Sequence, residues 1–173
     1  VSAVHINYGL RGNESDGDQE FVEALCKRLE IPLYTTKLDV KTRARGTSLQ
    51  AAARDLRYSA MADIARRCGA DRIAVGHSAD DQAETVLLWM LRGAGLSGLS
   101  GMPACRDGII VRPLYETRRT EILAYLQSEG LSFRRDSSND KPVYLRNRVR
   151  QEVVPALQRV APSAVKALCR LAD

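Results

Sequence analysis

The sequence predicts an α/β fold built around a parallel sheet. Short apolar segments, typical of buried strands, alternate with longer segments whose apolar residues recur at helical spacing. Loops of several residues join these segments, and such alternation favours parallel strands connected by right-handed crossovers. With 173 residues, of which 45% are hydrophobic, the chain is long enough to bury one globular core.

The first half of the chain predicts two strands and two helices in alternation. The expected strands span 1–6 and 33–40, and the expected helices run from Ser15 or Asp16 to the residues before Pro32 and from Ser48 to Gly69. Proline ends the first helix because it lacks a backbone donor, whereas serine caps and glycine closes the second. Between the second strand and the second helix, residues 41–47 predict a basic loop.

The second half continues the alternation and ends in helices. The expected strands span 72–75 and 109–111, and the expected helices run from Ala79 to about Arg92, from a Thr117 cap to about Gly130, from about Val143 onwards and over 163–171. The first strand begins without a preceding turn, and the last helix ends without a cap. We therefore expect the sequence to be part of a longer chain.

The segment from Gly76 to Thr85 is the most informative in the sequence. It places a histidine and three carboxylates where the strand at 72–75 gives way to a helix: His77, Asp80, Asp81 and Glu84. Ser78 is a favoured N-cap, and Asp81 three residues later can complete a capping box. With the helix beginning at Ala79, Glu84 has one acid three residues before it and another four residues before it, so the three acids converge.

This position predicts a ligand site. Open α/β sheets bind ligands at the carboxyl ends of their strands, and a helix N-terminus carries partial positive charge and free N–H groups. That environment suits phosphate and keeps the acids ionised, so that they could bind Mg²⁺ or a cationic amine. A capped surface helix with ordinary acidic residues would explain one aspartate, but it explains four such residues together less well.

Two further segments predict a ligand-facing surface. His5 and Asn7 end the first strand, so we expect them to enter the same crevice as the acids, although a histidine and an asparagine in a plain turn are an equal alternative. Residues 92–102 are rich in glycine, which permits positive φ and close backbone approach. We interpret them as a substrate-lining loop rather than a linker.

An arginine-rich segment at 134–150 predicts contacts with phosphate or RNA. Arg146 and Arg150 are four residues apart and share one helix face, which Arg148 cannot join. Guanidinium groups bind phosphates through paired hydrogen bonds. A solvated basic helix face is the alternative for this segment taken alone.

Composition narrows the functional class. The net charge of +5 is compatible with an anionic partner, and two histidines are too few for a histidine-rich metal site. The four cysteines are scattered without a Cys-x-x-Cys pair, which predicts free thiols in a reducing cytosol, with Cys26, Cys68 and Cys169 in the core. The sequence has no apolar run of about 18 residues and no signal-peptide pattern, so we expect a cytoplasmic protein without a membrane partner.

Taken in order, these motifs resemble the tRNA(Ile)-lysidine synthases. The resemblance rests on His5-Ile6-Asn7, Leu10-Arg11, Gly76-His77, Asp80 to Thr85, Arg92 to Gly95, Gly98-Leu99, Gly101-Met102, Arg112 to Leu114, Asp136, Ser138-Asn139, Tyr144, Arg146-Asn147 and Arg150. It implies an N-type ATP pyrophosphatase of the PP-loop superfamily, with an adenine-nucleotide α-hydrolase-like (Rossmann-like) three-layer fold truncated at its N-terminus and extended by C-terminal helices. The catalytic domain would span 1–160, and 161–173 would begin a helical connection to further domains.

The resemblance also implies a reaction. A ligase of this family uses ATP and Mg²⁺ to adenylate C2 of the wobble cytidine in tRNA(Ile) with a CAU anticodon. The ε-amine of L-lysine then displaces AMP and forms lysidine. A homodimer is compatible with the family pattern.

The family pattern assigns roles to individual residues. Asp81 and Glu84 would recognise lysine and orient its amine, and Arg146 would serve substrate activation. The residues assigned to the nucleotide are His5, Asn7, Gly76, His77 and Asp80, with Asp80 also assigned to Mg²⁺. The residues assigned to phosphate or tRNA are Arg54, Arg57, Arg92, Arg112 and Arg150.

The sequence departs from the family pattern at three places. Tyr8 stands where the family usually has a second histidine, and Phe133 where it has tryptophan. The pyrophosphate loop, Ser-Gly-Gly-x-Asp-Ser, is expected upstream of Val1. We therefore expect this piece to be inactive alone and to bind ATP more weakly than the full-length enzyme.

Three alternatives to lysidine synthesis stay open. A tRNA-thiolating pyrophosphatase would share the scaffold but usually carries paired Cys-x-x-Cys motifs. An amide-forming pyrophosphatase acting on a small molecule would leave the arginine-rich segment unexplained. A non-catalytic RNA-binding module would explain the net charge but not the three acids.

Overall fold

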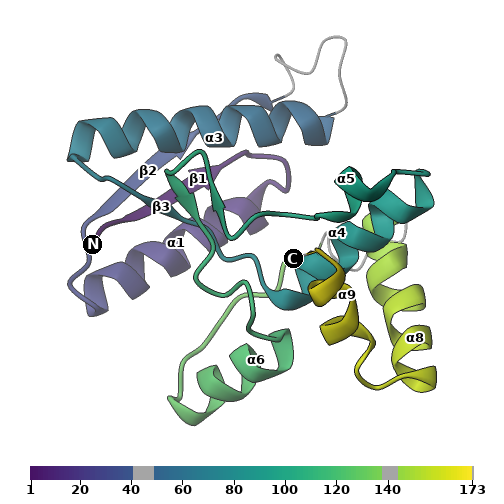
Figure 1. The fold of residues 1–173 in the computed structure, drawn as a ribbon. Helices are drawn as coiled ribbons and strands as arrows, with labels where there is room; N and C mark the ends of the chain where they lie inside the picture. The colour runs from purple at the N-terminus through teal and green to yellow at the C-terminus, as the bar shows by residue number, and fades with distance from the viewer. Residues whose placement is uncertain (41–48, 138–143, 173) are drawn as a thin grey trace. The chain divides into compact units, whose positions relative to one another are not determined.

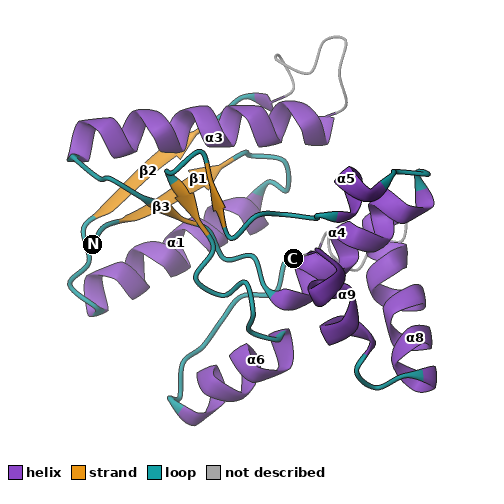
Figure 2. Ribbon diagram, in the orientation of Figure 1, coloured by secondary structure: helices purple, strands orange, loops and turns teal. Residues whose placement is uncertain are grey.

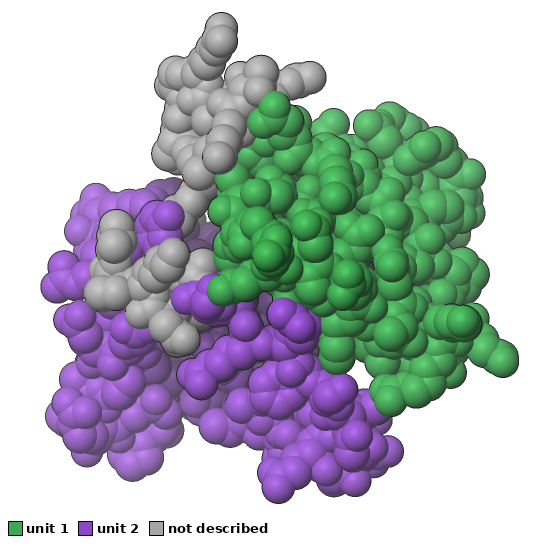
Figure 3. Space-filling view, turned by 180° about the vertical axis from the view of Figure 1, so that it is seen from behind, with its two compact units in different colours: residues 1–73 green, residues 74–173 purple. Residues whose placement is uncertain are grey.

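A computed structural model describes residues 1–40, 49–137 and 144–172 of the chain. They form two compact units, 1–73 and 74–173, which Figure 3 shows in different colours. The predicted basic loop at 41–47, the Ser48 cap and the motif residues Ser138 and Asn139 lie outside the described residues.

The first unit has a parallel pair of strands between helices, as the sequence predicts. Its elements in order are β1 (Ala3–Asn7), α1 (Asn13–Arg28), β2 (Leu33–Lys37) and α3 (Leu49–Cys68). Strands β1 and β2 pair in parallel, with Ala3 opposite Leu33. Helices α1 and α3 both contact β1, and Figure 1 shows them on opposite sides of the two strands.

Two details of the first unit follow from local chemistry. Helix α1 begins two residues before the predicted Ser15, after Gly12, whose φ of 54° requires glycine at the turn. Acidic side chains in its first turn and basic ones in its last turn favour the helix dipole. Gly69, with φ of 68°, follows the end of α3 as predicted.

The second unit contains short strands and most of the described helices (Figure 2). Its strands are β3 (Ile73–Ala74, which begins at the unit boundary), β4 (Cys105–Arg106) and β5 (Ile110–Val111), in the sheet order β3-β5-β4. Its helices are α4 (Ala79–Leu91), α5 (Leu96–Leu99), α6 (Arg119–Ser128), α7 (Leu145–Arg148), the π-helical turn η2 (Val149–Val153), α8 (Val154–Val160) and α9 (Ala164–Ala172).

Helix α4 is the centre of the second unit. It packs against α9 and also contacts α5, α7 and η2. The buried side chains of this core are Ala83, Leu87, Val149, Val154 and Val165. Burying a large aliphatic side chain contributes about 1.5–3 kcal/mol, so this packing holds α4 against the arginine-bearing segment that follows Tyr144.

Several predicted boundaries need correction in the second unit. Strand β4 was not expected, and it pairs antiparallel with β5 through a turn at Asp107 and Gly108, both with positive φ. Thr117 does not cap α6. The cap is Arg118, whose backbone N–H donates to Glu121 Oε2 at 2.7 Å, while the Thr117 carbonyl accepts from Ala79.

The remaining predictions about the chain are met in part. The glycine-rich connection contains the one-turn helix α5, and the helical pattern expected from Val143 begins at Leu145 among the described residues. Cys26 is buried, Cys68 and Cys169 are half-buried, and all three are free thiols. No described helix has the length and apolar character needed to cross a membrane.

Candidate functional site

The predicted capping box forms at the start of α4. The Asp81 N–H donates to Ser78 Oγ at 3.4 Å, and the Ser78 N–H donates back to Asp81 Oδ2 at 2.9 Å. The Ser78 hydroxyl donates to the same Oδ2 at 2.9 Å. The cap therefore uses one carboxylate oxygen of Asp81 and leaves Oδ1 to contact other partners.

Glu84 lies one turn further along α4 and is bound by two arginines. The residue is only 1% exposed, so its charge requires close partners. Arg150 donates from Nε to Oε1 at 2.6 Å and from Nη2 to Oε2 at 2.9 Å. Arg146 donates from Nε to Oε2 at 2.9 Å. The prediction that Arg146 and Arg150 share one face is confirmed.

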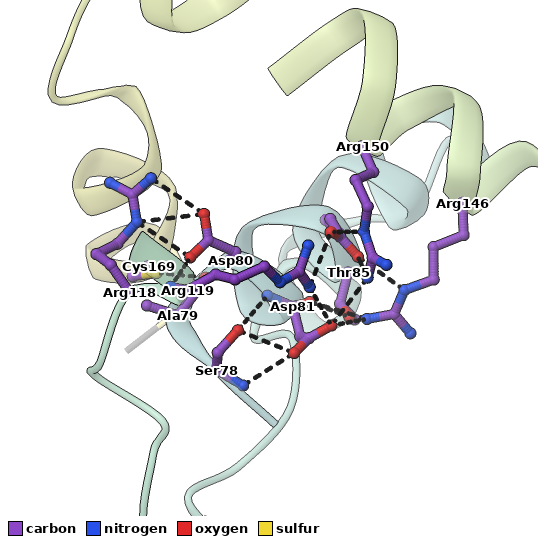
Figure 4. A network of polar contacts seen from close by, with 11 residues as sticks. Ser78, Ala79, Asp80, Asp81, Thr85, Arg118, Arg119, Arg146, Arg150 and Cys169 are labelled. Carbon is purple, nitrogen blue, oxygen red and sulfur yellow. Dashed lines mark hydrogen bonds and ion pairs between the residues drawn. The ribbon is translucent and has the colours of Figure 1, made fainter. Parts of the chain in front are cut away.

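The same arginines also contact Asp81 (Figure 4). Asp81 and Glu84 therefore share their partners. Asp81 Oδ1 accepts from Nη2 of Arg146 at 3.1 Å and from Nη2 of Arg150 at 3.2 Å. A third guanidinium, from Arg119, lies 3.6 Å from Asp81 Oδ1 and 4.0 Å from Glu84 Oε1. We call Asp81, Glu84, Arg119, Arg146 and Arg150 the acid–arginine cluster.

Asp80 belongs to a separate group of contacts. The Arg118 guanidinium donates from Nε to both Asp80 oxygens at 3.2 Å and from Nη2 to Oδ1 at 3.0 Å. The Arg119 backbone N–H donates to Oδ2 at 2.6 Å. The acids thus lie on one helix turn as predicted, but Asp80 contacts the start of α6, whereas the other two share guanidinium partners.

The sequence reasoning did not single out Arg118 and Arg119. Both lie at the start of α6, far along the chain from the acids they contact. Two adjacent arginines at a helix start oppose the helix dipole, which favours negative charge there. This unfavourable placement of two positive charges was the sequence signal that acids from another element neutralise Arg118 and Arg119.

The pKa values of Asp80, Asp81 and Arg150 are shifted toward their charged forms. Burial would raise the pKa of Asp81, but hydrogen bonds from Ser78 and the charges of Arg146 and Arg119 outweigh it, so the pKa lies below its usual value. Burial would lower the pKa of Arg150, but its hydrogen bond and ion pair with Glu84 raise it. Burial also acts to raise the pKa of Asp80, and Arg118 and Arg119 lower it overall.

Both carboxylate oxygens of Asp80 accept hydrogen bonds from the start of α6. A carboxylate offers about four lone-pair positions, and Asp80 accepts three N–H groups, two from the Arg118 guanidinium and one from the Arg119 backbone. Within the described residues, no group of three or more His, Cys, Asp or Glu side chains could hold a metal. Mg²⁺ is usually held by one or two carboxylates together with substrate phosphates and water, so the assignment of Asp80 to Mg²⁺ with ATP stays a prediction.

The start of α4 also offers less to a phosphate than expected. The N–H groups of Ser78 and Asp81 are used by the capping box, and that of Ala79 donates to the Thr117 carbonyl at 3.0 Å. Gly76 and His77 lie in the connection between β3 and α4, directly before this cap. In the second unit, the guanidinium groups of the cluster are therefore better placed than the helix N-terminus to bind an anion.

The other residues assigned to the nucleotide lie in the first unit. Asn7 is buried, and its side chain donates to Asp16 Oδ1 and Gln19 Oε1 at 3.1 Å and accepts from the Gly9 N–H at 2.8 Å. These bonds attach the end of β1 to α1. Burial lowers the pKa of His5 despite the nearby charges of Asp18 and Glu23. Whether His5 and Asn7 share a crevice with the acids stays a prediction.

The arginines assigned to phosphate or tRNA occupy different environments. Arg54 and Arg57 lie over the Tyr58 ring on α3, at 5.4 and 5.5 Å from its centroid. Arg92 is exposed and lies over the Trp89 ring at 5.4 Å. Arg112 is only 4% exposed, and its Nη1 donates to the Pro103 carbonyl. Their contacts with RNA stay predictions.

The glycine-rich segment packs against α4 at Gly101. The buried side chain of Gln82 accepts from the Met102 N–H at 2.8 Å and donates to the Tyr115 hydroxyl at 2.7 Å. Gly101 has φ of 60°, and a Cβ there would lie 2.6 Å from Gln82 Nε2. Close packing therefore requires this glycine, and a substrate-lining role for the segment stays a prediction.

Comparison with known proteins identifies similar chains. The PP-loop domain family matches residues 1–157. A tRNA(Ile)-lysidine synthase of Porphyromonas gingivalis (strain ATCC BAA-308 / W83) is 44% identical over 170 residues, which are 97% of this chain and 37% of the relative. One of Geobacter sulfurreducens is 45% identical over 173 residues, which are 98% of this chain and 37% of the relative. The chain thus spans a little over a third of the curated relatives it matches.

A solved structure supports the fold. The U34-tRNA thiolase NcsA from Methanococcus maripaludis, with its [4Fe-4S] cluster, superposes with a TM-score of 0.76 at 15% identity. The match covers 96% of this chain and 58% of the thiolase. At this identity the likeness concerns the fold alone, and it agrees with the α/β architecture that the sequence predicts.

Proposed function

The chain belongs to the PP-loop domain family, and from that membership we propose that it is the ATP-pyrophosphatase part of a tRNA(Ile)-lysidine synthase. The proposed reaction joins lysine to C2 of the wobble cytidine of tRNA(Ile), after ATP has supplied the adenylate that activates this carbon. The names of the curated relatives, at 44–45% identity over almost the whole chain, support this substrate pair. Lysine and a tRNA with a CAU anticodon are the expected partners.

The paired acids at the start of α4 are the observation that carries the proposal. An enzyme that uses lysine as a nucleophile must hold an ammonium group beside an electrophilic carbon and orient the amine. Asp81 and Glu84 share one face of α4 and contact the same partners, so they could contact one ammonium together. The lowered pKa of Asp81 makes it a weak base, which suits it to binding and orientation.

The arginines of the cluster are suited to the adenylation step of the reaction. Adenylation transfers a charged phosphoryl group, and guanidinium groups stabilise such charge through directed hydrogen bonds. Arg146 is the proposed activating residue because it contacts both acids and is also partly exposed. Gly76 and His77, directly before the cap of α4, are proposed to line the nucleotide side of the site.

An incorporation assay tests the proposal directly. The full-length gene product would be incubated with ATP, radiolabelled L-lysine and a tRNA(Ile) transcript carrying the CAU anticodon. We expect ATP-dependent incorporation of lysine into this transcript and none into a control transcript with uridine at the wobble position.

The alternative functions give different results in the same assay. With a sulfur donor added to the mixture, incorporation of sulfur into the transcript in place of lysine would indicate a thiolating enzyme. Lysine transfer to a small molecule would indicate an amide-forming one. Binding of the transcript without any ATP-dependent product would contradict the proposal and favour a non-catalytic RNA-binding module.

A further inference from the structure

The acid–arginine cluster carries more positive than negative charge. Two carboxylates, Asp81 and Glu84, face three guanidinium groups, so the cluster has a net charge of +1. Glu84 accepts three N–H groups at 2.6–2.9 Å. Asp81 directs Oδ2 to the Ser78 cap and Oδ1 to Arg146 and Arg150. The oxygens of both acids are therefore occupied.

This arrangement cannot accept the ammonium group that the proposed function assigns to it. An ammonium group only donates hydrogen bonds, so it needs carboxylate lone pairs, and here guanidinium groups use them. It would also approach a cluster that is already positive. Lysine can bind to Asp81 and Glu84 only if at least part of the guanidinium charge moves away.

We infer that the cluster exchanges counter-ions: a phosphate group binds Arg119, Arg146 and Arg150 and draws them from Asp81 and Glu84, which then bind the lysine ammonium. This inference rests on the proposed function. A phosphate dianion changes the net charge of the cluster from +1 to −1, so the phosphate and the ammonium favour each other's binding. Lysine would then bind to Asp81 and Glu84 only after a phosphate-bearing substrate has bound to the arginines.

The exposure of the arginines supports the exchange. The side chains of Arg119 and Arg146 are 40% and 36% exposed, so an anion in solvent can reach them, whereas Glu84 beneath them is 2% exposed. Arg119 is also the most loosely held, at 3.6 and 4.0 Å from the two acids. The acids lie on α4 and the arginines on α6, α7 and η2, so long arginine side chains can move without altering the helix that holds the acids.

Calorimetry of lysine binding tests the exchange. L-lysine would be titrated into the full-length gene product at constant ionic strength in chloride alone, with pyrophosphate, with a non-hydrolysable ATP analogue, or with an anticodon stem-loop RNA. We expect at least one phosphate-bearing probe to tighten lysine binding by about 5- to 150-fold. The effective probe distinguishes a nucleotide phosphate from an RNA phosphate as the source.

Two variants separate the exchange from a structural role of the arginines. Arg119→Gln lowers the cluster charge to zero, so lysine should bind more tightly without any anion, and the effect of the probe should shrink. Arg148→Gln is the control, because it removes the same charge from α7, which carries Arg146, but Arg148 is 57% exposed and contacts Glu152 at 3.5 Å. The control should bind lysine as the unaltered protein does, with the same response to the probe.

The opposite results would overturn the inference. If the arginines bind the carboxylate of lysine itself, pyrophosphate would compete with lysine and weaken its binding, and Arg119→Gln would weaken it too. Lysine binding that no phosphate probe changes would also exclude the exchange. The incorporation assay measures ligation independently of lysine binding. An active ligase whose lysine binding does not depend on phosphate would reject only the exchange. Absence of ligation would reject the proposed function.

Discussion

At the scale of single residues, Glu84 gives the sharpest test of the lysine pocket. Glu84→Gln keeps the shape of the side chain but removes the charge that would pair with the substrate ammonium. A charge-assisted hydrogen bond is worth about 1.5–3 kcal/mol, so the KM for lysine should rise by about 10- to 150-fold. The KM for ATP should change little, because adenylation does not use the amine. Steady-state kinetics with each substrate varied in turn would measure both.

Asp80→Asn provides the matched comparison on the same helix turn. The Asp80 carboxylate contacts the Arg118 guanidinium and the Arg119 backbone N–H, not the guanidinium groups that Asp81 and Glu84 share, so its loss should leave the lysine KM nearly unchanged. Its assignment to the nucleotide and Mg²⁺ predicts a weaker use of ATP. Partial unfolding would lower kcat by reducing the active fraction and would not by itself alter KM. An unchanged lysine KM in Glu84→Gln would mean that Glu84 only neutralises Arg146 and Arg150.

The aspartates also predict how stability depends on pH. Burial opposes their ionisation, but hydrogen bonds and arginine charges lower the folded-state pKa of both Asp80 and Asp81. Their contribution to the free energy of unfolding is present above the unfolded pKa of about 3.9 and is lost as the pH falls through the folded pKa. Urea denaturation between pH 7 and pH 3 should therefore show a loss of stability below about pH 4.

An aspartate substitution isolates that contribution. Asp81→Asn should be less stable than the unaltered protein at pH 7, and its stability should fall less steeply in acid. Asp71→Asn, at an exposed position, is the control and should keep the original pH dependence. A similar acid-induced loss in Asp81→Asn and the unaltered protein would assign the effect to other groups.

The residue-scale predictions succeeded where the interaction is local. The spacing of Ser78 and Asp81 predicted their capping box, because the bonds of a cap depend only on residues three apart. The partners of Asp80 could not be predicted in the same way. Arg118 lies 38 residues further along the chain, beyond α5, β4 and β5, and only the fold determines which distant charges come into contact.

At the scale of the elements, the packing of the glycine-rich segment on α4 can be tested at Gly101. Gly101→Ala would strain a positive φ and place Cβ 2.6 Å from a buried Gln82 side chain that is held by two hydrogen bonds. Strain of this kind and overpacking each cost about 1–3 kcal/mol. We expect a loss of about 2–4 kcal/mol in the free energy of unfolding, measured by urea denaturation.

Gly108 offers the control for that substitution. It has φ of 65°, but a Cβ there would meet no atom within 4 Å. Gly108→Ala should therefore cost only the backbone strain, about 1–2 kcal/mol. Equal losses in the two variants would show that Gln82 moves aside and that packing does not require Gly101.

The elements that the sequence did not predict have identifiable causes. The antiparallel turn before β5 had a local signal, because Asp107-Gly108 is a dipeptide that favours two-residue hairpins. The π-helical turn η2 had none, since such turns arise where packing forces an extra residue into a helix. It includes Arg150 and Val149, which contact Glu84 and the core respectively.

At the scale of the whole molecule, the alternating pattern predicted the parallel pair β1–β2 and the order of strands and helices. It did so because burial on both faces of a sheet imposes apolar strands and amphipathic helices throughout a chain. Asn7 and Gly76 belong to different compact units. Hydrophobic periodicity describes each unit by itself, so the expectation that these two strand ends share a crevice stays a prediction.

The net charge of +5 is compatible with an anionic partner. The salt dependence of the affinity for such a partner can show which arginines contact it. Arg92 is exposed beside Trp89, so Arg92→Gln should lower the slope of log affinity for tRNA against log salt by about 0.7–0.9, one phosphate contact. Filter binding of full-length protein to tRNA(Ile) over a range of chloride concentrations would measure this slope.

Arg112→Gln is the informative comparison because Arg112 is buried and donates to the Pro103 carbonyl. It should leave the slope unchanged and lower the free energy of unfolding by about 1–3 kcal/mol, since that carbonyl loses its donor. A reduced slope in Arg112→Gln together with unchanged stability would reverse the roles assigned to the two arginines.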